Sequence, residues 1–148
     1  MIRFEFSVNI DRPASEVFAY LTDPANLPEW QSSAIEAHWE GEKAKGGRVK
    51  EVRKFLGRRM ESELEVTEYE PDRRFGLKVL TGPVPFSVHH RLEARNGGTT
   101  LTFTGEGEPG GFFKLAEPIV ARTAERQFRG DFETLKDVLE ARAGASRP

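Results

Sequence analysis

The sequence predicts an α+β fold with a seven-stranded antiparallel sheet, two short helices after the first strand and a long C-terminal helix. Three observations predict it: apolar and polar residues alternate over residues 2–10, turn sequences divide residues 33–107 into further strand-like segments, and a helical period follows Gly111. The 148 residues are enough to bury a core. We expect one domain over residues 1–143 and a flexible tail over residues 144–148.

The composition argues against several classes of function. There are 22 basic and 24 acidic residues, which give a formal net charge of −2, whereas a nucleic-acid-binding protein usually has a basic excess. The absence of cysteine excludes disulfides, thiol nucleophiles and cysteine-bound zinc. No signal-peptide pattern and no apolar run near the roughly 18 residues of a membrane span occur. A cytoplasmic location is therefore expected, and the sequence leaves a homodimer possible.

The N-terminal segment gives the clearest local pattern. One face of the predicted strand over residues 2–10 carries Ile2, Phe4, Phe6, Val8 and Ile10. Pro13 then suits the first turn of a helix, and apolar residues at helical spacing follow it. Asp23-Pro24 predicts a second short helix that ends near Trp30.

The middle of the chain is predicted to form a meander of six strands. Short turns rich in glycine, proline and asparagine separate the segments, so consecutive strands are expected to pair antiparallel. The predicted strands lie at about 34–40, 47–55, 59–70, 73–80, 85–95 and 99–107.

The C-terminal segment has a helical period that continues to about Ala143. Its apolar stripe contains Ala121, Ala124, Phe128, Leu135, Val138 and Leu139. A helix of about 25 residues would be roughly 37 Å long, which is the length of a whole small domain. We therefore expect this helix to lie across the sheet.

Four sequence segments resemble one known family. They are RPASEVFAYLTDPANLPEW (12–30), FLGRRMESELEVTEYEPDRRF (55–75), GPVPFSVHHRLEARNGGTTLTFTGEGE (82–108) and AERQFRGDFETLKDVLE (124–140). They are similar to the polyketide cyclase/dehydrase and lipid-transport group of the START-like, or SRPBCC, superfamily. The resemblance implies a helix-grip fold, in which a curved sheet surrounds the long helix and leaves an apolar cavity. Members bind lipids, sterols, polyketides or quinones, some catalyse cyclisation or dehydration, and others act on protein partners.

The cavity also follows from geometry, because a single helix is too narrow to fill a strongly curved sheet. Strand alternation and the helical stripe then indicate which residues line it, and Trp30 and Phe113 are expected near its mouth. Alternatively, the phenylalanines fill the core, and a solidly packed centre would favour an interaction module. The predicted ligand-binding residues are Trp30, Leu64, Phe75, Leu77, Phe86, Val88, His90, Phe103, Phe113, Val120, Ala124 and Phe128.

His90 is the one candidate catalytic residue. Alternation places His90 inside the sheet and His89 outside it. A neutral imidazole in an apolar pocket can act as a general base or orient a ligand carbonyl. The alternative, which the lack of a second catalytic group favours, is a histidine whose hydrogen bonds are satisfied by a neighbouring group. The three histidines have no metal-ligand spacing, so neither a metal nor a cofactor is expected.

The orientations of three charged residues are left open by the sequence. Glu51 and Arg53 share the parity of the apolar residues of their strand, so they face the cavity unless a β-bulge shifts the register. Asp131 lies on the apolar stripe of the helix, but a slight rotation would bury Phe132 and leave Asp131 in water, and helical geometry favours that arrangement. Gly130 either allows a close approach or merely softens the helix.

Three hypotheses about function follow. The first is a carrier or sensor that binds a hydrophobic small molecule such as a lipid, polyketide or isoprenoid. The second is an aromatase/cyclase-like or dehydratase-like enzyme that uses His90 and needs a second polar group in the same pocket. The third is a protein-interaction module, which would require an exposed apolar patch.

Overall fold

The computed structural model describes residues 2–55, 57–82, 85–107 and 117–145. The element order is the one predicted from the sequence, and the elements are: β1 (Ile2–Ile10), α1 (Ala14–Leu21), the 3-10 helix η1 (Pro24–Asn26), α2 (Leu27–Trp30), β2 (Ala34–Glu40), β3 (Arg48–Phe55), β4 (Arg58–Glu70), β5 (Arg74–Thr81), β6 (Phe86–Arg95), β7 (Gly98–Gly107) and α3 (Glu117–Ala145).

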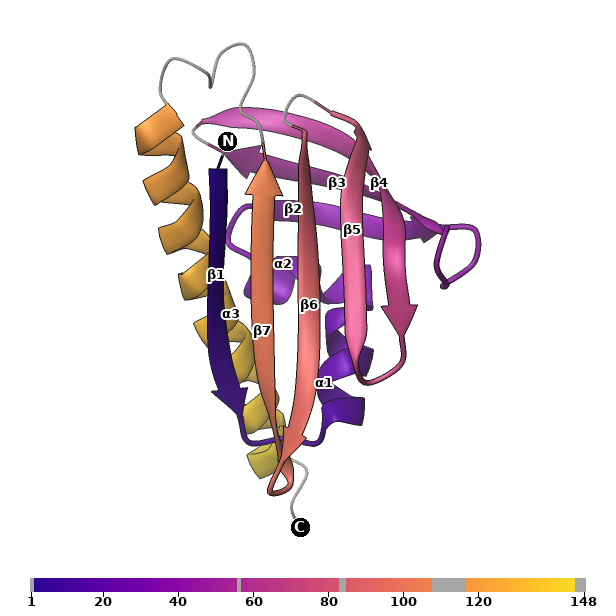
Figure 1. The fold of residues 1–148 in the computed structure, drawn as a ribbon, viewed down its shortest axis with the longest axis vertical. Coiled ribbons are helices and arrows are strands. Elements are labelled where there is room, and N and C mark those ends of the chain that lie inside the picture. Colours follow the sequence, from indigo (N-terminus) through magenta and orange to yellow (C-terminus); the bar gives the residue numbers. More distant parts are fainter. Residues whose placement is uncertain (1, 56, 83–84, 108–116, 146–148) are drawn as a thin grey trace.

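The strands form one antiparallel sheet in the order β1-β7-β6-β5-β4-β3-β2. Every strand pairs with its neighbour in sequence except β1, which pairs with the last strand, β7. The sheet curves strongly, so that β2 and β3 run across the far side of the hollow from β1 and β7 (Figure 1). The α+β helix-grip architecture predicted from the sequence is therefore confirmed.

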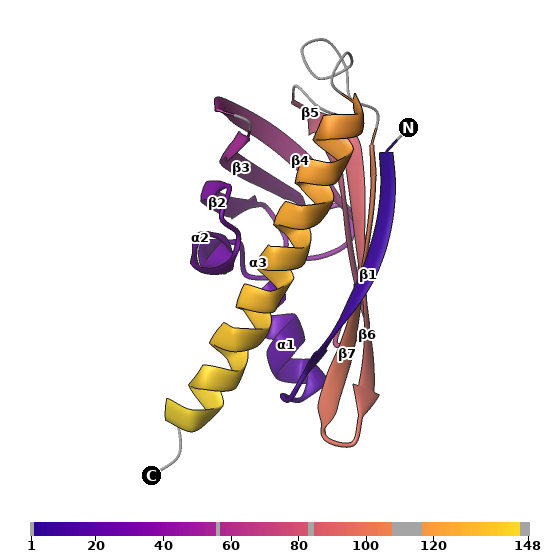
Figure 2. The same ribbon diagram turned by 90° about the vertical axis from the view of Figure 1, so that its left-hand side faces the viewer.

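The long helix α3 crosses the open side of this curved sheet (Figure 2). It contacts β1, as between Phe128 and Phe4 and between Phe132 and Phe6, and it contacts α2 near its middle. At 1.5 Å per residue its 29 residues extend about 44 Å. The helix continues to Ala145, so residues 144 and 145 are helical, although the sequence assigned them to the tail.

The turns explain why the meander forms. Between β6 and β7, Asn96 and Gly97 both have positive φ angles, of 47° and 83°. This geometry gives a tight hairpin whose twist matches that of the flanking strands. The register then follows without a shift from Arg95 opposite Gly98 to Phe86 opposite Gly107.

The short helices differ slightly from the prediction. The second one is divided into a 3-10 turn, η1, and a single α-helical turn, α2. The side chain of Asp23 accepts a hydrogen bond from the backbone N–H of Ala25 and so caps the start of η1. Together the two elements carry the chain from α1 to β2 and place Trp30 against α3.

Candidate functional site

A cavity lies between the concave face of the sheet, α2 and α3. Its volume is about 50 Å³. This space accommodates one or two water molecules. The walls are mainly apolar, with a small polar part. The lining residues are Leu21, Leu27, Trp30, Gln31, Glu51, Arg53, Leu64, Phe75, Leu77, Phe86, Val88, His90, Phe103 and Phe128.

The apolar wall is built by strand alternation. The register pairs Phe75 with His90, Leu77 with Val88, and His90 with Phe103. These cross-strand partners share one face of the sheet, so β5, β6 and β7 present a continuous apolar surface. Four of the apolar lining residues, Leu27, Leu77, Phe86 and Phe128, are only half-buried, which means that the wall is not fully enclosed by other side chains.

The polar end of the cavity is a buried ion pair on β3. Arg53 Nε donates to Glu51 Oε1 at 2.9 Å, and Arg53 Nη2 donates to Glu51 Oε2 at 3.0 Å. Both side chains are largely buried. The pairing of β3 with β4 is regular from Arg48 to Phe55, so no bulge turns these charges outward. Glu51 and Arg53 therefore face the cavity, which is one of the two orientations that the sequence leaves open.

Two residues of the segment between α2 and β2 complete the environment of Arg53. Its Nη1 donates to Ser33 Oγ at 2.9 Å, and its Nη2 donates to the side-chain oxygen of Gln31 at 3.0 Å. Lys54 anchors the same segment, because its backbone N–H donates to the carbonyl of Ser33 at 2.8 Å. We call Gln31, Ser33, Glu51 and Arg53 the polar cluster.

Asp131 is buried beside the polar cluster, although it does not line the cavity. Its Oδ1 accepts hydrogen bonds from the backbone N–H and the hydroxyl of Ser32, both at 3.0 Å. Its Oδ2 is buried and has no partner in the described part of the chain. Burial raises the pKa of Asp131, whereas the two bonds from Ser32 and the charge of Arg53 lower it.

The expectation that Asp131 lies in water is wrong. Asp131 is 4% exposed and Phe132 is 1% exposed, so both neighbours are buried. The reason is that α3 is covered on two sides: Phe132 faces the sheet, and Asp131 faces the segment after α2. The sequence reasoning assumed a single buried face for this helix.

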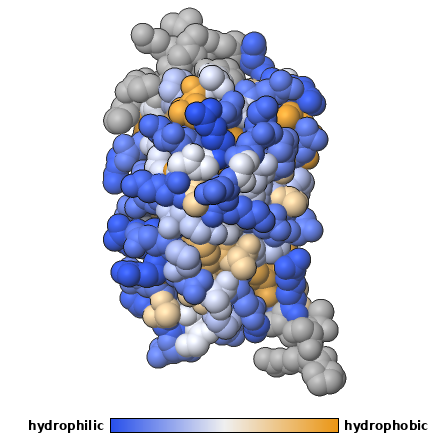
Figure 3. Space-filling view, turned by 90° about the vertical axis from the view of Figure 1, so that its right-hand side faces the viewer, coloured by the Kyte–Doolittle hydropathy of each residue, from blue (hydrophilic) through white to orange (hydrophobic). Residues whose placement is uncertain are grey.

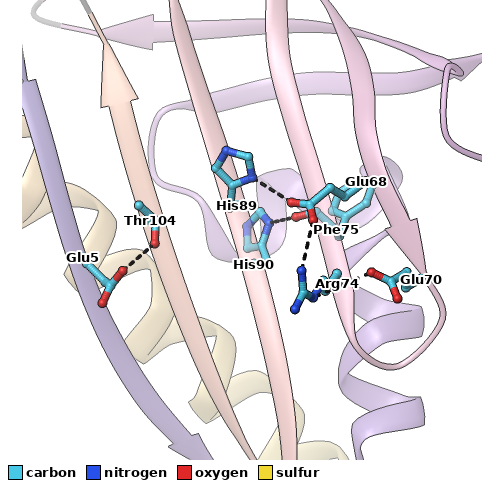
Figure 4. Close-up of polar contacts among 8 residues, drawn as sticks. All are labelled: Glu5, Glu68, Glu70, Arg74, Phe75, His89, His90 and Thr104. Carbon is cyan, nitrogen blue, oxygen red and sulfur yellow. Dashed lines mark hydrogen bonds and ion pairs between the residues drawn. The ribbon is translucent and has the colours of Figure 1, made fainter.

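His90 lies inside, as alternation predicts. Its Nδ1 is 2.9 Å from the backbone carbonyl of Phe75 (Figure 4), so this nitrogen carries the proton and donates it. Burial lowers the pKa of His90 to about 4. The residue is therefore a neutral imidazole at pH 7, held by a backbone group, and its Nε2 is an acceptor. His89 lies on the outer face and pairs with Glu68 at 2.8 Å (Figure 4).

Next to the cavity, the interior is filled by aromatic rings. Phe132 lies 4.8 Å from Phe103, 5.0 Å from Trp30 and 5.5 Å from Phe6, measured between ring centroids. His90 touches the same group, at 5.8 Å from Phe132. We call Phe6, Trp30, Phe103 and Phe132 the aromatic cluster. The hollow of the sheet is thus partly packed and partly open.

Most of the residues predicted to bind a ligand lie around the cavity: Trp30, Leu64, Phe75, Leu77, Phe86, Val88, His90, Phe103 and Phe128. Trp30 lines it as a buried side chain, 2% exposed, which differs from the expected position at the mouth. Ala124 is half-buried on α3 but is not part of the lining. Phe113 lies outside the described residues, and the side chain of Val120 is not described.

Five lining residues are absent from the predicted ligand-binding set, and for two of them, Glu51 and Arg53, the sequence leaves the orientation open. Leu21 and Leu27 belong to the short helices, whose orientation toward the sheet cannot be read from their own pattern. Gln31 follows Trp30 directly and carries no motif. Glu51 and Arg53 had a usable signal, because their parity matches that of Val49 on the same strand.

Within the described parts of the chain, no three histidine, aspartate or glutamate side chains are grouped so that they could hold a metal ion. Among the described helices, none is long and apolar enough to cross a membrane.

The chain belongs to the family described as polyketide cyclase / dehydrase and lipid transport, whose model matches residues 1–140. This match confirms the predicted membership of the START-like superfamily. A comparison with curated protein sequences gives no match.

Solved structures with the same fold include three bacterial proteins. A protein from Thermus thermophilus has a TM-score of 0.83 at 15% identity, over 98% of this chain and 99% of its own. A START superfamily protein from Mycobacterium smegmatis has a TM-score of 0.78 at 12% identity, over 95% and 99%. A protein from Rhodobacter sphaeroides has a TM-score of 0.72 at 25% identity, over 95% and 93%.

Proposed function

We propose that the protein is a carrier or sensor that binds a small hydrophobic molecule in the cavity between the sheet and α3. The observation that carries this proposal is the lining of the cavity, in which apolar side chains from β4 to β7 and α3 face the polar cluster. Such a combination of apolar walls and a few polar groups is typical of small-molecule sites. The family description, with its reference to lipid transport, supports the same class of ligand.

The volume of the cavity sets a condition on this function. About 50 Å³ is smaller than the roughly 150 Å³ of an engineered cavity that accepts benzene. A ring-sized ligand therefore requires the half-buried wall residues Leu77, Phe86 and Phe128 to move outward. Apolar surface removed from water contributes about 25 cal/mol per Å², which offsets this displacement.

The enzyme hypothesis has one observation in its favour. Glu51 and Arg53 line the same cavity as His90, so polar groups accompany the histidine. However, a pKa of about 4 makes His90 a weak base near pH 7. A cyclisation or dehydration activity that is lost in His90→Leu, while the fold persists, would establish this alternative.

The interaction hypothesis receives less support. Among the described residues the large hydrophobic side chains that are exposed are Ile35, Leu80 and Ile119, which lie on three different elements. The face drawn in Figure 3 is mainly hydrophilic, with small apolar groups between charged side chains. A docking surface would need a larger continuous apolar area.

Binding can be tested by NMR with 4-methylphenol as the probe. Trp30 lines the cavity, whereas the indole nitrogen of Trp39 donates to the carbonyl of Thr22 at 3.1 Å and serves as an internal reference. We expect the Trp30 signal to shift during the titration and the Trp39 signal to stay in place. Native mass spectrometry of the protein purified from its host would then identify a natural ligand.

A pair of variants on β5 provides the control. Leu77→Trp fills the cavity and is expected to abolish the shift, while Leu80→Trp places the same bulk at an exposed position of the same strand. The proposal is wrong if no lining residue responds to millimolar 4-methylphenol, or if both variants respond like the wild type.

A further inference from the structure

We infer that the cavity selects ligands whose polar end is an uncharged hydroxyl or carbonyl group and rejects carboxylates and phosphates. This inference rests on the proposed function, since it assigns a ligand class to the same cavity. It is drawn from the charges and the free hydrogen-bonding groups of the polar cluster.

The charge of Arg53 is already neutralised. Glu51 receives two of its hydrogen bonds, and both residues line the cavity. The carboxyl group of Asp131 also acts electrostatically on Arg53 and adds negative charge when it is ionised. An anionic ligand would therefore lose its hydration without meeting a net positive charge, and burying an uncompensated charge costs much more than burying a neutral polar group.

The neutral polar groups of a ligand, in contrast, can form hydrogen bonds with donors at the cavity. Trp30 lines the cavity, and its indole N–H is buried without a hydrogen-bond partner in the described structure. An unsatisfied buried donor is unfavourable, so a ligand oxygen that accepts from it removes this cost. Gln31 uses its side-chain oxygen for Arg53, which leaves its amide N–H groups as further donors at the cavity.

Acceptors for a ligand hydroxyl are present as well. The carboxylate of Glu51 has lone pairs beyond the two bonds from Arg53. The neutral His90, which lines the cavity, donates through Nδ1 to the carbonyl of Phe75 and keeps Nε2 as an acceptor. A hydroxyl group, which both donates and accepts, can use the donors and the acceptors, and a carbonyl group can use the donors. Neither carries the negative charge that disfavours a carboxylate here.

The test compares three ligands with one aromatic body: 4-methylphenol, 4-methylbenzoate and 1,4-dimethylbenzene, titrated at pH 7 and followed through the Trp30 signal. We expect 4-methylphenol to bind at least about tenfold more tightly than 4-methylbenzoate. It should also bind more tightly than 1,4-dimethylbenzene. Equal or tighter binding of 4-methylbenzoate, or equal binding of the phenol and the hydrocarbon, overturns the inference and leaves the proposed function intact. Failure of all three to bind overturns both.

Glu51→Gln gives the sharper result. It removes the negative partner of Arg53 with almost no change in shape, so the preference is expected to move toward 4-methylbenzoate by about tenfold or more. Glu61→Gln is the matched control, because it makes the same charge change at an exposed residue on the outer face of β4 and should leave the preference unchanged. An unchanged preference in Glu51→Gln contradicts the inference.

Should Glu51→Gln fail to fold, Trp30→Phe tests the same idea without a change of charge. Because this variant lacks the Trp30 signal, binding is followed through the methyl signals of Leu64, which also lines the cavity. The substitution is expected to weaken the binding of 4-methylphenol severalfold and to leave that of 1,4-dimethylbenzene unaffected, because only the phenol uses the indole donor. Equal weakening of both ligands would count against the assignment.

Discussion

Two neighbouring regions of the interior differ in how they are filled. In the aromatic cluster, Phe6, Phe103 and Phe132 lie within 4.8–5.5 Å of one another between ring centroids. In the cavity, the same sheet and helix surround about 50 Å³ of space, with a buried ion pair at one end. Close ring packing contributes strongly to stability, whereas a buried ion pair contributes little net stability. The comparison indicates that the aromatic cluster contributes more to the stability of the fold than the cavity does.

The largest expected effect is the loss of a ring from the aromatic cluster. Phe132→Ala removes a side chain that is 1% exposed and touches four other rings, so we expect it to lower the free energy of unfolding by about 3–5 kcal/mol. Phe86→Ala removes a ring from the half-buried cavity wall and should cost about 1–2 kcal/mol. Urea unfolding of both variants measures the difference. Equal costs would mean that the two regions are packed alike.

An intermediate effect is expected from His90, which borders both regions. Burial lowers its pKa from 6.5 to about 4, so between these values the unfolded chain binds more protons than the folded one. The contribution of neutral His90 to the free energy of unfolding is complete above pH 6.5. It is lost as the pH falls to 4, and the free energy of unfolding decreases by about 3 kcal/mol.

The measurement is the free energy of unfolding from pH 7 to pH 4 in the wild type and in His90→Leu. The loss of stability between pH 7 and pH 4 is expected to be smaller in the variant by about 3 kcal/mol. An unchanged pH dependence in His90→Leu would show that folding does not lower the pKa of His90.

The sequence predicts the fold well because the fold is set by local patterns. Alternation from Ile2 to Ile10 and the turn at Asn96-Gly97 specify strands and hairpins almost to the residue. These features depend on residues close together in the chain, so periodicity is sufficient to find them.

The site is predicted less completely because it depends on contacts between distant segments. The apolar wall follows from parity, but the polar cluster requires the segment after α2 to meet β3, as when Gln31 binds Arg53. The burial of Asp131 likewise depends on Ser32, which is 99 residues away in sequence. No spacing rule relates such pairs, and only the folded chain brings them together.

The smallest expected effect concerns the outer face of α3, opposite both interior regions. A Cβ atom added at Gly130 meets nothing within 4 Å, so the glycine serves no close approach. Because glycine in a helix interior is less favourable than alanine by about 1 kcal/mol, Gly130→Ala is expected to raise the free energy of unfolding by about that amount. Gly76→Ala on β5 is the contrasting variant: its Cβ would lie 2.6 Å from Thr67 Oγ1, so it should destabilise the protein. Urea unfolding distinguishes the two, and a loss of stability in Gly130→Ala would mean that this face of α3 is engaged by another part of the protein.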